Sequence, residues 1–434
     1  MTIEIEIKFI ANDEAVSNLP HWLAAWPHQH CAGEKLTNIY FETSDNQLRR
    51  WDMGLRIRGF GDRYEMTLKG KGDSIGGLHQ RAEYNVPLSQ PTLDIALLPT
   101  EIWPENTDVA ALQQRLSALF STHFVREKWT ISYQQSEIEV AFDRGEVAAG
   151  DLSEPLHEIE LELKSGERQD LMAFAAELAR YDGLRLGSLS KAARGYALAQ
   201  GNPERPLRPL PLLAVKNKAR VEEGMQAALQ LGLAQWQYHE ELWLRGNPQA
   251  LGEIKTALAL IREALALFGA LVPRKASTVL RQQLTALENI LEIEPPAADN
   301  LCFSAAWLQP QLALTDWLVG KRWLAFLNEK DSARLQGSLK RFADIMLSRI
   351  AADLRETFEN VQQPGQYQDK LTRLQRQLLA VHLLGGIYPA EAVVRWLEPW
   401  QLLARSVALR QQHMLKVQTR EALKQPPFWK HSGQ

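Results

Sequence analysis

From Met1 to about Ser165, the chain is dominated by segments in which apolar and polar residues alternate. This period of two predicts half-buried β-strands, because successive side chains of a strand point to opposite faces of its sheet. Turn signals such as Gly59–Asp62 and Gly70–Gly77 separate neighbouring segments. We therefore expect about eight strands, at Ile3–Phe9, Leu36–Phe41, Leu55–Arg58, Glu65–Lys69, Arg81–Pro87, Lys128–Tyr133, Glu137–Phe142 and Glu158–Lys164.

Three segments of the same region have apolar residues spaced as on one face of a helix. They predict amphipathic helices at Asp13–Trp26, Asp108–Phe120 and Gln169–Tyr181. Such helices can cover the apolar face of a sheet, so we expect them to flank the strands.

A proline-rich segment, Pro203–Pro211, marks a change in the pattern. Its four prolines in nine residues favour an extended linker. Beyond it, apolar faces with helical spacing predict helices at Ala250–Leu271, Ser277–Ile293, Ala305–Leu327, Ser338–Phe358, Gln366–Leu384, Ala390–Leu403 and Ser406–Leu423. The predicted organisation is a strand-rich domain (1–202), a linker (203–215), an all-α helical-bundle domain (216–425) and a frayed tail (426–434), with Pro295 and Pro296 dividing the helical domain into two lobes.

Composition excludes several classes of protein. The 434 residues carry a formal net charge of −3, so no overall basicity favours nucleic acid or an anionic membrane. Two cysteines, far apart in sequence, do not form a disulfide framework or a cysteine metal cluster. The chain opens without a basic or apolar leader and contains no apolar run of about 20 residues. We expect a cytoplasmic protein.

The first and last predicted strands carry carboxylates on one face. Glu4, Glu6 and Lys8 alternate with apolar residues in the first strand, and the last strand carries Glu158, Glu160 and Glu162 at the same period. Acidic stripes in one sheet repel each other unless a cation lies between them. Hard divalent ions such as Mg²⁺ or Mn²⁺ bind this kind of carboxylate set.

The intervening strands carry basic residues at the same period. Arginine and lysine are the side chains that bind phosphate, and here they are Arg56, Arg58, Lys69, Arg81, Arg126 and Lys128. If the sheet closes into an eight-stranded antiparallel barrel, this face becomes a polar lumen for a metal and a polyanion. Lys191 and Arg194, three residues apart, would add two cations on one helix face above the lumen.

These segments resemble the CYTH superfamily, the triphosphate tunnel metalloenzymes. Glu4-Ile-Glu6-Ile-Lys8 matches its ExExK signature. Further segments follow in the family's order over residues 1–200, namely Leu55–Arg58, Thr67–Lys69, Arg81–Glu83, Asp143–Gly145, Glu158–Lys164 and Ser190–Gly195. The resemblance implies an α+β fold with an eight-stranded antiparallel tunnel barrel and flanking helices.

The resemblance also implies roles for individual residues. Metal would be held by Glu4, Glu6, Asp143, Glu160 and Glu162, helped by Glu139 and Glu158. Triphosphate would be bound by Lys8, Arg56, Arg58, Lys69, Arg81, Arg126, Lys191 and Arg194, with Glu83 orienting Arg81. Lys8, Glu4 and Glu6 would be the catalytic residues, and Lys8 would bind the attacked phosphate or help to activate water.

The helical half resembles a CHAD domain, a two-lobed module expected to bind polyphosphate through basic residues and histidines. Its basic residues are sparse here, with Lys255 and Arg262 in one helix and Lys370, Arg373 and Arg376 in another. The resemblance makes long-chain polyphosphate one expected partner of this half. Because its basic residues are sparse, a structural role beside the barrel is the other expectation.

The pairing of the two modules resembles bacterial inorganic triphosphatases. It predicts a hydrolase of phosphoanhydride bonds that uses Mg²⁺ or Mn²⁺ to cleave tripolyphosphate into pyrophosphate and phosphate. Thiamine triphosphatase, adenylate cyclase or a non-catalytic polyphosphate-binding scaffold are the alternatives on the same tunnel. An RNA 5′-triphosphatase would share the tunnel, but the chain offers RNA no basic stripe outside it.

Overall fold

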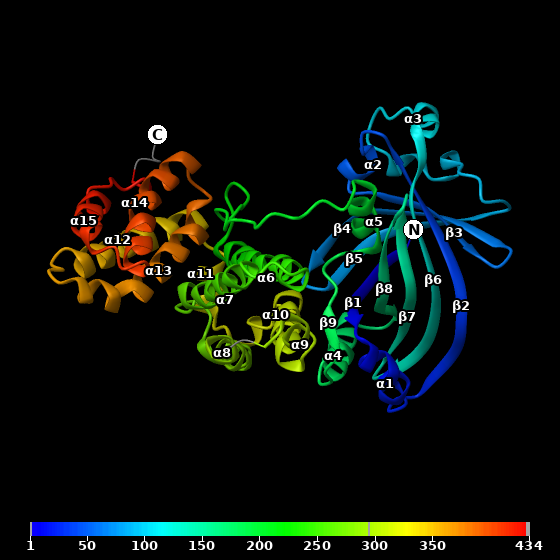
Figure 1. Ribbon diagram of the computed structural model, residues 1–434, viewed down its shortest axis with the longest axis horizontal. Coiled ribbons are helices and arrows are strands. Elements are labelled where there is room, and N and C mark those ends of the chain that lie inside the picture. The colour runs from blue at the N-terminus through cyan, green and yellow to red at the C-terminus, as the bar shows by residue number, and fades with distance from the viewer. Residues whose placement is uncertain (1, 294–295, 431–434) are drawn as a thin grey trace. The chain divides into compact units, whose positions relative to one another are not determined.

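The strand-rich half closes into an eight-stranded antiparallel barrel (Figure 1). The computed structural model describes residues 2–293 and 296–430. Around the barrel the strands run β5-β4-β3-β2-β6-β7-β8-β1, and β1 pairs with β5 to complete the ring. The strands are β1 (Thr2–Ala11), β2 (His28–Thr43), β3 (Gly54–Phe60), β4 (Arg63–Ile75), β5 (Leu78–Leu88), β6 (Leu116–Tyr133), β7 (Ser136–Ala149) and β8 (Leu152–Ser165). The predicted fold is confirmed.

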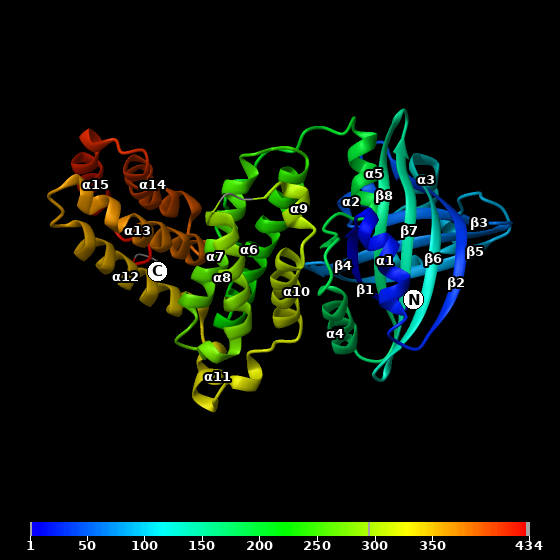
Figure 2. The ribbon, with the colours of Figure 1, turned by 60° about the horizontal axis from the view of Figure 1, so that its bottom comes forward.

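The alternating pattern places apolar side chains outside the barrel and charged side chains inside it. On β1, Ile7 and Phe9 are fully buried in an outer apolar cluster, whereas Glu6 and Lys8 are buried in the interior. Helices α1 (Asp13–Leu23) and α4 (Arg168–Leu178) contribute to the outer cluster, so they flank the barrel as expected (Figure 2). A short strand, β9 (Leu184–Leu186), extends the sheet beside the end of β1.

Several sequence-based boundaries in this half are wrong. Strands β2 and β6, for example, begin at His28 and Leu116, well before the predicted Leu36 and Lys128. Helix α3 covers only Val109–Arg115, because β6 begins at Leu116 and pairs with β2 from there on. The expected turn at Gly70–Gly77 is mostly strand, and β4 continues to Ile75 past a bulge. Gly72 belongs in this bulge because a Cβ there would lie 2.4 Å from the Gln80 carbonyl oxygen.

Two short helices lie near the barrel's interior residues. They are α2 (Gln47–Arg50), between β2 and β3, and α5 (Lys191–Ala199), which follows β9. Helix α5 starts with Ser190 as its N-cap, and the Ser190 side chain accepts a hydrogen bond from the Ala193 backbone. Lys191 and Arg194 therefore lie on one helix, as their spacing predicts.

The chain forms two compact units that are not continuous in sequence. The first comprises Met1–Pro206 with Ile293–Gly320, and the second comprises Leu207–Glu292 with Lys321–Gln434. Helices α9 (Ala298–Cys302) and α10 (Ala305–Val319) thus belong with the barrel. Leu308 and Leu312 of α10 join the same apolar cluster as β1, α1 and α4.

The second unit is helical. It contains α6 (Val221–Leu244), α7 (Ala250–Leu267), α8 (Thr278–Glu292), α11 (Glu329–Leu335), α12 (Leu339–Phe358), α13 (Pro364–Gly385), α14 (Ala390–Ala408) and α15 (Leu415–Leu423). Short 3₁₀ turns of this unit lie at Arg274–Ser277, Leu324–Phe326 and Gln412–Met414, and the barrel unit has two more, at Ile95–Leu97 and Thr100–Ile102. The described part of the chain has no helix that combines the length and the hydropathy of a membrane span.

Several predicted helices of this half have different limits. The segment Ala305–Leu327 is an α-helix only to Val319, and α14 runs on through Ser406 to Ala408. Pro295, one of the two residues expected to divide the lobes, lies outside the described residues. The end expected to be frayed is docked as far as Trp429, whose ring packs against Trp396 and whose Nε1 donates to Ser348.

Candidate functional site

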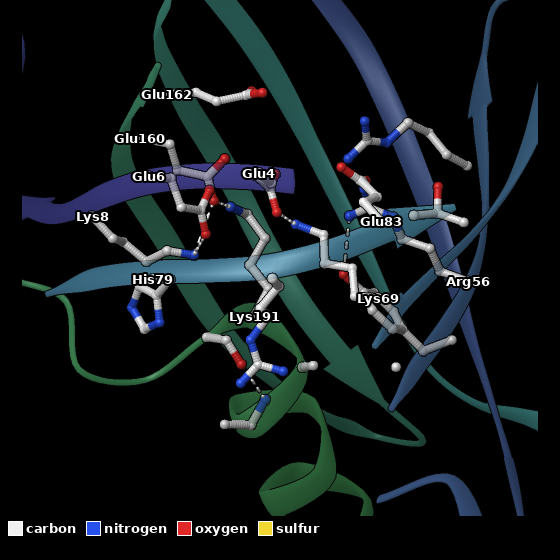
Figure 3. Close-up of a pocket in the computed structure, with 18 of the residues that line it drawn as sticks. Glu4, Glu6, Lys8, Arg56, Lys69, His79, Glu83, Glu160, Glu162 and Lys191 are labelled. Carbon is white, nitrogen blue, oxygen red and sulfur yellow. Dashed lines mark hydrogen bonds and ion pairs between the residues drawn. The ribbon is translucent and has the colours of Figure 1, made fainter. Parts of the chain in front are cut away.

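The barrel encloses a cavity of about 580 Å³ that is lined mostly by charged side chains (Figure 3). Most of the residues predicted for the site line it, namely Glu4, Glu6, Lys8, Arg56, Arg58, Lys69, Glu83, Arg81, Arg126, Glu139, Glu160, Glu162 and Lys191. Side chains from distant parts of the sequence, β1 to α5, therefore meet in one space.

One wall of this cavity is acidic. Strands β7, β8 and β1 are adjacent in the barrel, and Glu162 lies opposite both Glu139 and Glu6 in the ladder. Directly opposed residues have Cβ atoms about 5 Å apart. This row of three carboxylates therefore favours the binding of a cation.

The facing wall is basic. Arg81 on β5, Lys69 on β4, and Arg56 and Arg58 on β3 line the cavity from three adjacent strands. Arg126, on β6, lies at the other side of the acidic wall. Burial, followed by repulsion from Arg56 and Arg126, lowers the pKa of Arg58 to about 10. This wall therefore favours the binding of an anion.

Lysine side chains pair with the carboxylates of the acidic wall. Lys69 Nζ lies 2.5 Å from Glu4 Oε2, a contact drawn as a dashed line in Figure 3. Lys8 Nζ lies 3.0 Å from Glu160 Oε1, 3.1 Å from Glu158 Oε1 and 3.6 Å from Glu6 Oε1. These buried lysines and carboxylates are thus paired, as burial requires.

Lys191 and Arg126 bind the innermost carboxylates. Lys191 Nζ lies 2.6 Å from Glu158 Oε1 and 2.8 Å from both Glu160 Oε1 and Asp143 Oδ2. Arg126 forms a two-pronged pair with Asp143, through contacts of 2.6 Å from Nε and Nη2. Oxygens of Asp143, Glu158 and Glu160 lie within 4.8 Å of one another, a spacing that could hold a metal ion.

The network keeps most of its groups charged at neutral pH. Burial alone would raise the pKa of Glu160, but Lys191 and Lys8 outweigh it and hold that pKa well below its usual range. Burial would lower the pKa of Lys8, but Glu158 and Glu6 reverse the effect and raise it. Glu4 differs, because burial raises its pKa despite Lys69. A cation bound there would stabilise its ionised form.

Three predicted site residues lie outside the cavity lining. Glu158 is fully buried and binds Lys8 and Lys191. Asp143 is fully buried and lies behind the cavity, where both of its oxygens bind Arg126. Arg194 points away from the cavity and donates to Glu154 Oε2 and to the Pro155 carbonyl. Arg194 therefore fastens α5 to the start of β8.

Other cavity residues escaped the sequence analysis, among them Tyr40, Arg49, Asp52 and His79. One of them carried a usable signal, because His79 shares the strand face of Arg81, two residues away. Tyr40 is brought to the site by strand pairing, opposite Arg56 in the ladder between β2 and β3. No sequence pattern pointed to Arg49, because it lies in the four-residue helix α2.

Within residues 2–293 and 296–430, three buried polar atoms of cavity-lining residues have no hydrogen-bond partner. They are Arg56 Nε, Thr67 Oγ1 and His79 Nε2. Unpaired buried polar atoms are costly and often mark a ligand site. Phosphate oxygens would accept hydrogen bonds from the arginine and the threonine, and the carboxylates offer the oxygen ligands that Mg²⁺ and Mn²⁺ prefer. The residues present fit both a polyanion and a hard divalent ion.

The basic residues predicted on α13 are less available to an anion. Arg373 pairs with Asp353, and Arg376 Nε lies 3.0 Å from Glu263 Oε2. Polyphosphate binding by the helical half stays a prediction.

Comparison with known proteins agrees with this arrangement. A model of the CYTH domain matches residues 2–196, and a model of the CHAD domain matches residues 227–422. An inorganic triphosphatase of Haemophilus influenzae is 39% identical over 203 residues, which are 46% of this chain and 55% of that protein. This chain thus spans little more than half of that relative.

Two solved structures each match about half of this chain. The Hippeastrum protein HpAC1, described as a candidate adenylyl cyclase with a dominant triphosphatase activity, is 19% identical with a TM-score of 0.35, and the match covers 47% of this chain and 98% of that one. The CHAD domain from the plant Ricinus communis is 16% identical with a TM-score of 0.36, and the match covers 50% of this chain and 90% of that one.

Proposed function

Because the chain carries a CYTH domain followed by a CHAD domain, we propose that it is a metal-dependent inorganic triphosphatase. It would cleave tripolyphosphate into pyrophosphate and phosphate. The observation that carries this proposal is the single cavity in which a row of carboxylates faces a wall of arginines and lysines. A binder of polyanions alone has little use for the acidic wall.

The cavity favours an inorganic substrate over a nucleotide. Nucleotide bases are commonly bound by stacking on an aromatic ring. Tyr40 stacks on Phe120 with ring centroids 4.5 Å apart, and the guanidinium of Arg49 lies over the ring of Tyr196. Both aromatic rings of the lining are therefore already engaged within the described part of the chain. The relative named as an inorganic triphosphatase supports the same choice.

The chain's own residues would position the substrate and neutralise its charge. Arg56, Arg58, Lys69 and Arg81 would hold the phosphates along the basic wall, and Lys8 and Lys191 would lie at the acidic one. Phosphoryl transfer depends mainly on such positioning and electrostatic stabilisation. The oxygen of water bonds to the terminal phosphorus while the bridging P–O bond breaks. The electron pair leaves with pyrophosphate, and the water proton passes to the products or solvent.

Glu4, Glu6, Glu160 and Glu162 would hold the metal, since all four line the cavity. A bound divalent ion would neutralise phosphate oxygens and orient the attacking water. We assign Asp143 a different role from the one expected from sequence. Its contacts to Arg126 and Lys191 would fix these two cations at the edge of the site.

Substitution of Glu6 tests the metal site. We expect Glu6→Gln to reduce phosphate release from tripolyphosphate by about 100-fold or more, since it removes a charged ligand. Binding of Mn²⁺, followed by electron paramagnetic resonance, should weaken in the same variant. Glu127→Gln is the matched control, because Glu127 is only half-buried on β6 and pairs with His30 outside the cavity. Normal turnover and Mn²⁺ binding by Glu6→Gln would refute the assignment.

A further inference from the structure

Arg49 is a cavity residue whose charge is not matched by a carboxylate. It lies on α2, lines the cavity and is exposed, so it lies at the solvent-facing edge of the site. Within 4.0 Å of its guanidinium there is no carboxylate among the described residues. Most other cavity cations do have such partners, at 3.7 Å or less, namely Lys8, Arg56, Lys69, Arg81, Arg126, Lys128, Lys164 and Lys191. Arg58 also lacks such a carboxylate among the described residues, but it is largely buried and its Nε donates to Asn38 Oδ1 over 3.0 Å.

The buried carboxylate of Glu42 holds the backbone at Arg49. Glu42 is 2% exposed and lies at the end of β2. Its Oε2 accepts a hydrogen bond of 2.9 Å from the Arg49 backbone N–H, and its Oε1 accepts one of 2.9 Å from Leu48. Oε1 also accepts from the backbone of Thr43 at 2.8 Å. The carboxylate therefore fixes the course of α2 relative to the barrel wall.

Tyr196 of α5 contacts both Glu42 and Arg49. Its hydroxyl donates to Glu42 Oε2 over 2.6 Å, and its ring faces the Arg49 guanidinium, 4.6 Å from the ring centroid. Glu42 thus holds the backbone of Arg49 directly, and it holds the Arg49 side chain through the ring of Tyr196. Such a cation–π contact orients a guanidinium and leaves its N–H donors free.

We propose that Arg49 binds a phosphate group of the substrate at the exposed edge of the cavity, and that Glu42 and Tyr196 are its positioning residues. The inference rests on the proposed function for the identity of the substrate. A guanidinium without an acidic partner can form two parallel hydrogen bonds to phosphate oxygens. Because the group is exposed, solvent screens its charge, and we expect a moderate contribution to binding.

Binding and turnover, measured separately, test the role of Arg49. Calorimetric titration with tripolyphosphate in EDTA gives Kd, and phosphate release with Mg²⁺ gives kcat and KM. We expect Arg49→Gln to raise Kd and KM about five- to tenfold with kcat nearly unchanged, as for one lost charge-assisted contact. Arg50→Gln is the matched control, because the neighbouring Arg50 pairs with Asp45 and does not line the cavity.

Identical Kd values for Arg49→Gln, Arg50→Gln and the unaltered protein would overturn the inference. Absence of turnover by the unaltered protein would instead contradict the proposed function, while the titration would still decide whether Arg49 binds the anion.

A double-mutant cycle tests the positioning residues. If Tyr196 acts through Arg49, Tyr196→Phe should raise KM about threefold alone and add nothing to Arg49→Gln. A merely structural role for the hydroxyl would give additive effects on KM, and this outcome would refute the positioning role.

Discussion

At the scale of single residues, the cavity is a network of buried charges in which Lys8, Arg126 and Lys191 each contact more than one acid. Lys191 contacts Asp143, Glu158 and Glu160, and Lys8 shares two of these partners. Transfer of ions from water to a protein interior is costly, and only close pairing offsets it. The shared partners therefore keep the lysines protonated and make the inner part of the site insensitive to pH near neutrality.

His79 is the exception, and it makes stability depend on pH. Burial, followed by the charge of Lys8, lowers the pKa of His79 to about 4 from its usual 6.5. The unfolded chain therefore takes up a proton as pH falls below 6.5, whereas the folded protein does so only near pH 4. Stability is retained above pH 6.5 and lost as pH falls towards 4, by up to about 3 kcal/mol.

Replacement of His79 isolates this effect. We expect the urea-unfolding free energy of metal-free His79→Asn to fall less than that of the unaltered protein between pH 6.5 and 4. Equal losses in both proteins would show that His79 does not titrate in the way the structure indicates.

At the scale of elements, helix α5 brings Lys191 into the cavity through a close contact with β6. A Cβ on Gly195 would lie 2.1 Å from Phe120 Cδ2, so only glycine lets the helix approach this strand. Phe120 in turn stacks on Tyr40, a lining residue. The position of Lys191 therefore depends on the small size of Gly195, which lies one turn further along the helix.

A pair of glycine substitutions tests this dependence. We expect Gly195→Ala to lower the free energy of unfolding by about 1–3 kcal/mol through overpacking and to reduce turnover as Lys191 moves. Gly252→Ala on α7, where a Cβ would meet nothing within 4 Å, should be neutral or stabilising by up to about 1 kcal/mol. Urea unfolding and phosphate release measure both effects. Wild-type stability and turnover in Gly195→Ala would contradict the close contact.

Local patterns identified the elements of the barrel better than their limits. The alternation on β1 correctly separates Ile7 and Phe9 from Glu6 and Lys8, because a strand's period is local. The adjacency of β7, β8 and β1 depends on long-range pairing, which no local pattern contains. Helix α6 was missed because it buries polar residues such as Gln235 and Glu240 beside apolar ones, which hides an apolar face.

Side-chain direction limited the prediction of the site. Lys191 and Arg194 share one helix, yet only Lys191 reaches the cavity, because Glu154 and a carbonyl bind Arg194 elsewhere. Asp143 has the parity of a lumen residue but is covered by Arg126. Spacing identifies a face, whereas the partners on neighbouring strands decide which side chains meet a ligand.

At the scale of the whole molecule, the unit that contains the cavity draws on both halves of the sequence. Helix α10 adds Leu308 and Leu312 to the apolar cluster outside β1, so this unit includes a segment from beyond the linker. The β4–β5 turn also contacts this helix, since a Cβ on Gly76 would lie 2.0 Å from Thr315 Oγ1. A fragment ending at the linker would lack this cover. The full chain is therefore the right material for functional measurements.

The central claim is that the cavity hydrolyses a linear inorganic triphosphate. The most direct test is phosphate release by the full chain, with Mg²⁺ and with Mn²⁺, from tripolyphosphate, thiamine triphosphate, ATP and long-chain polyphosphate side by side. We expect tripolyphosphate to be the preferred substrate, with equal amounts of pyrophosphate and phosphate as products and no turnover in EDTA. Preference for an organic triphosphate, or tight binding of all four without turnover, would contradict the account.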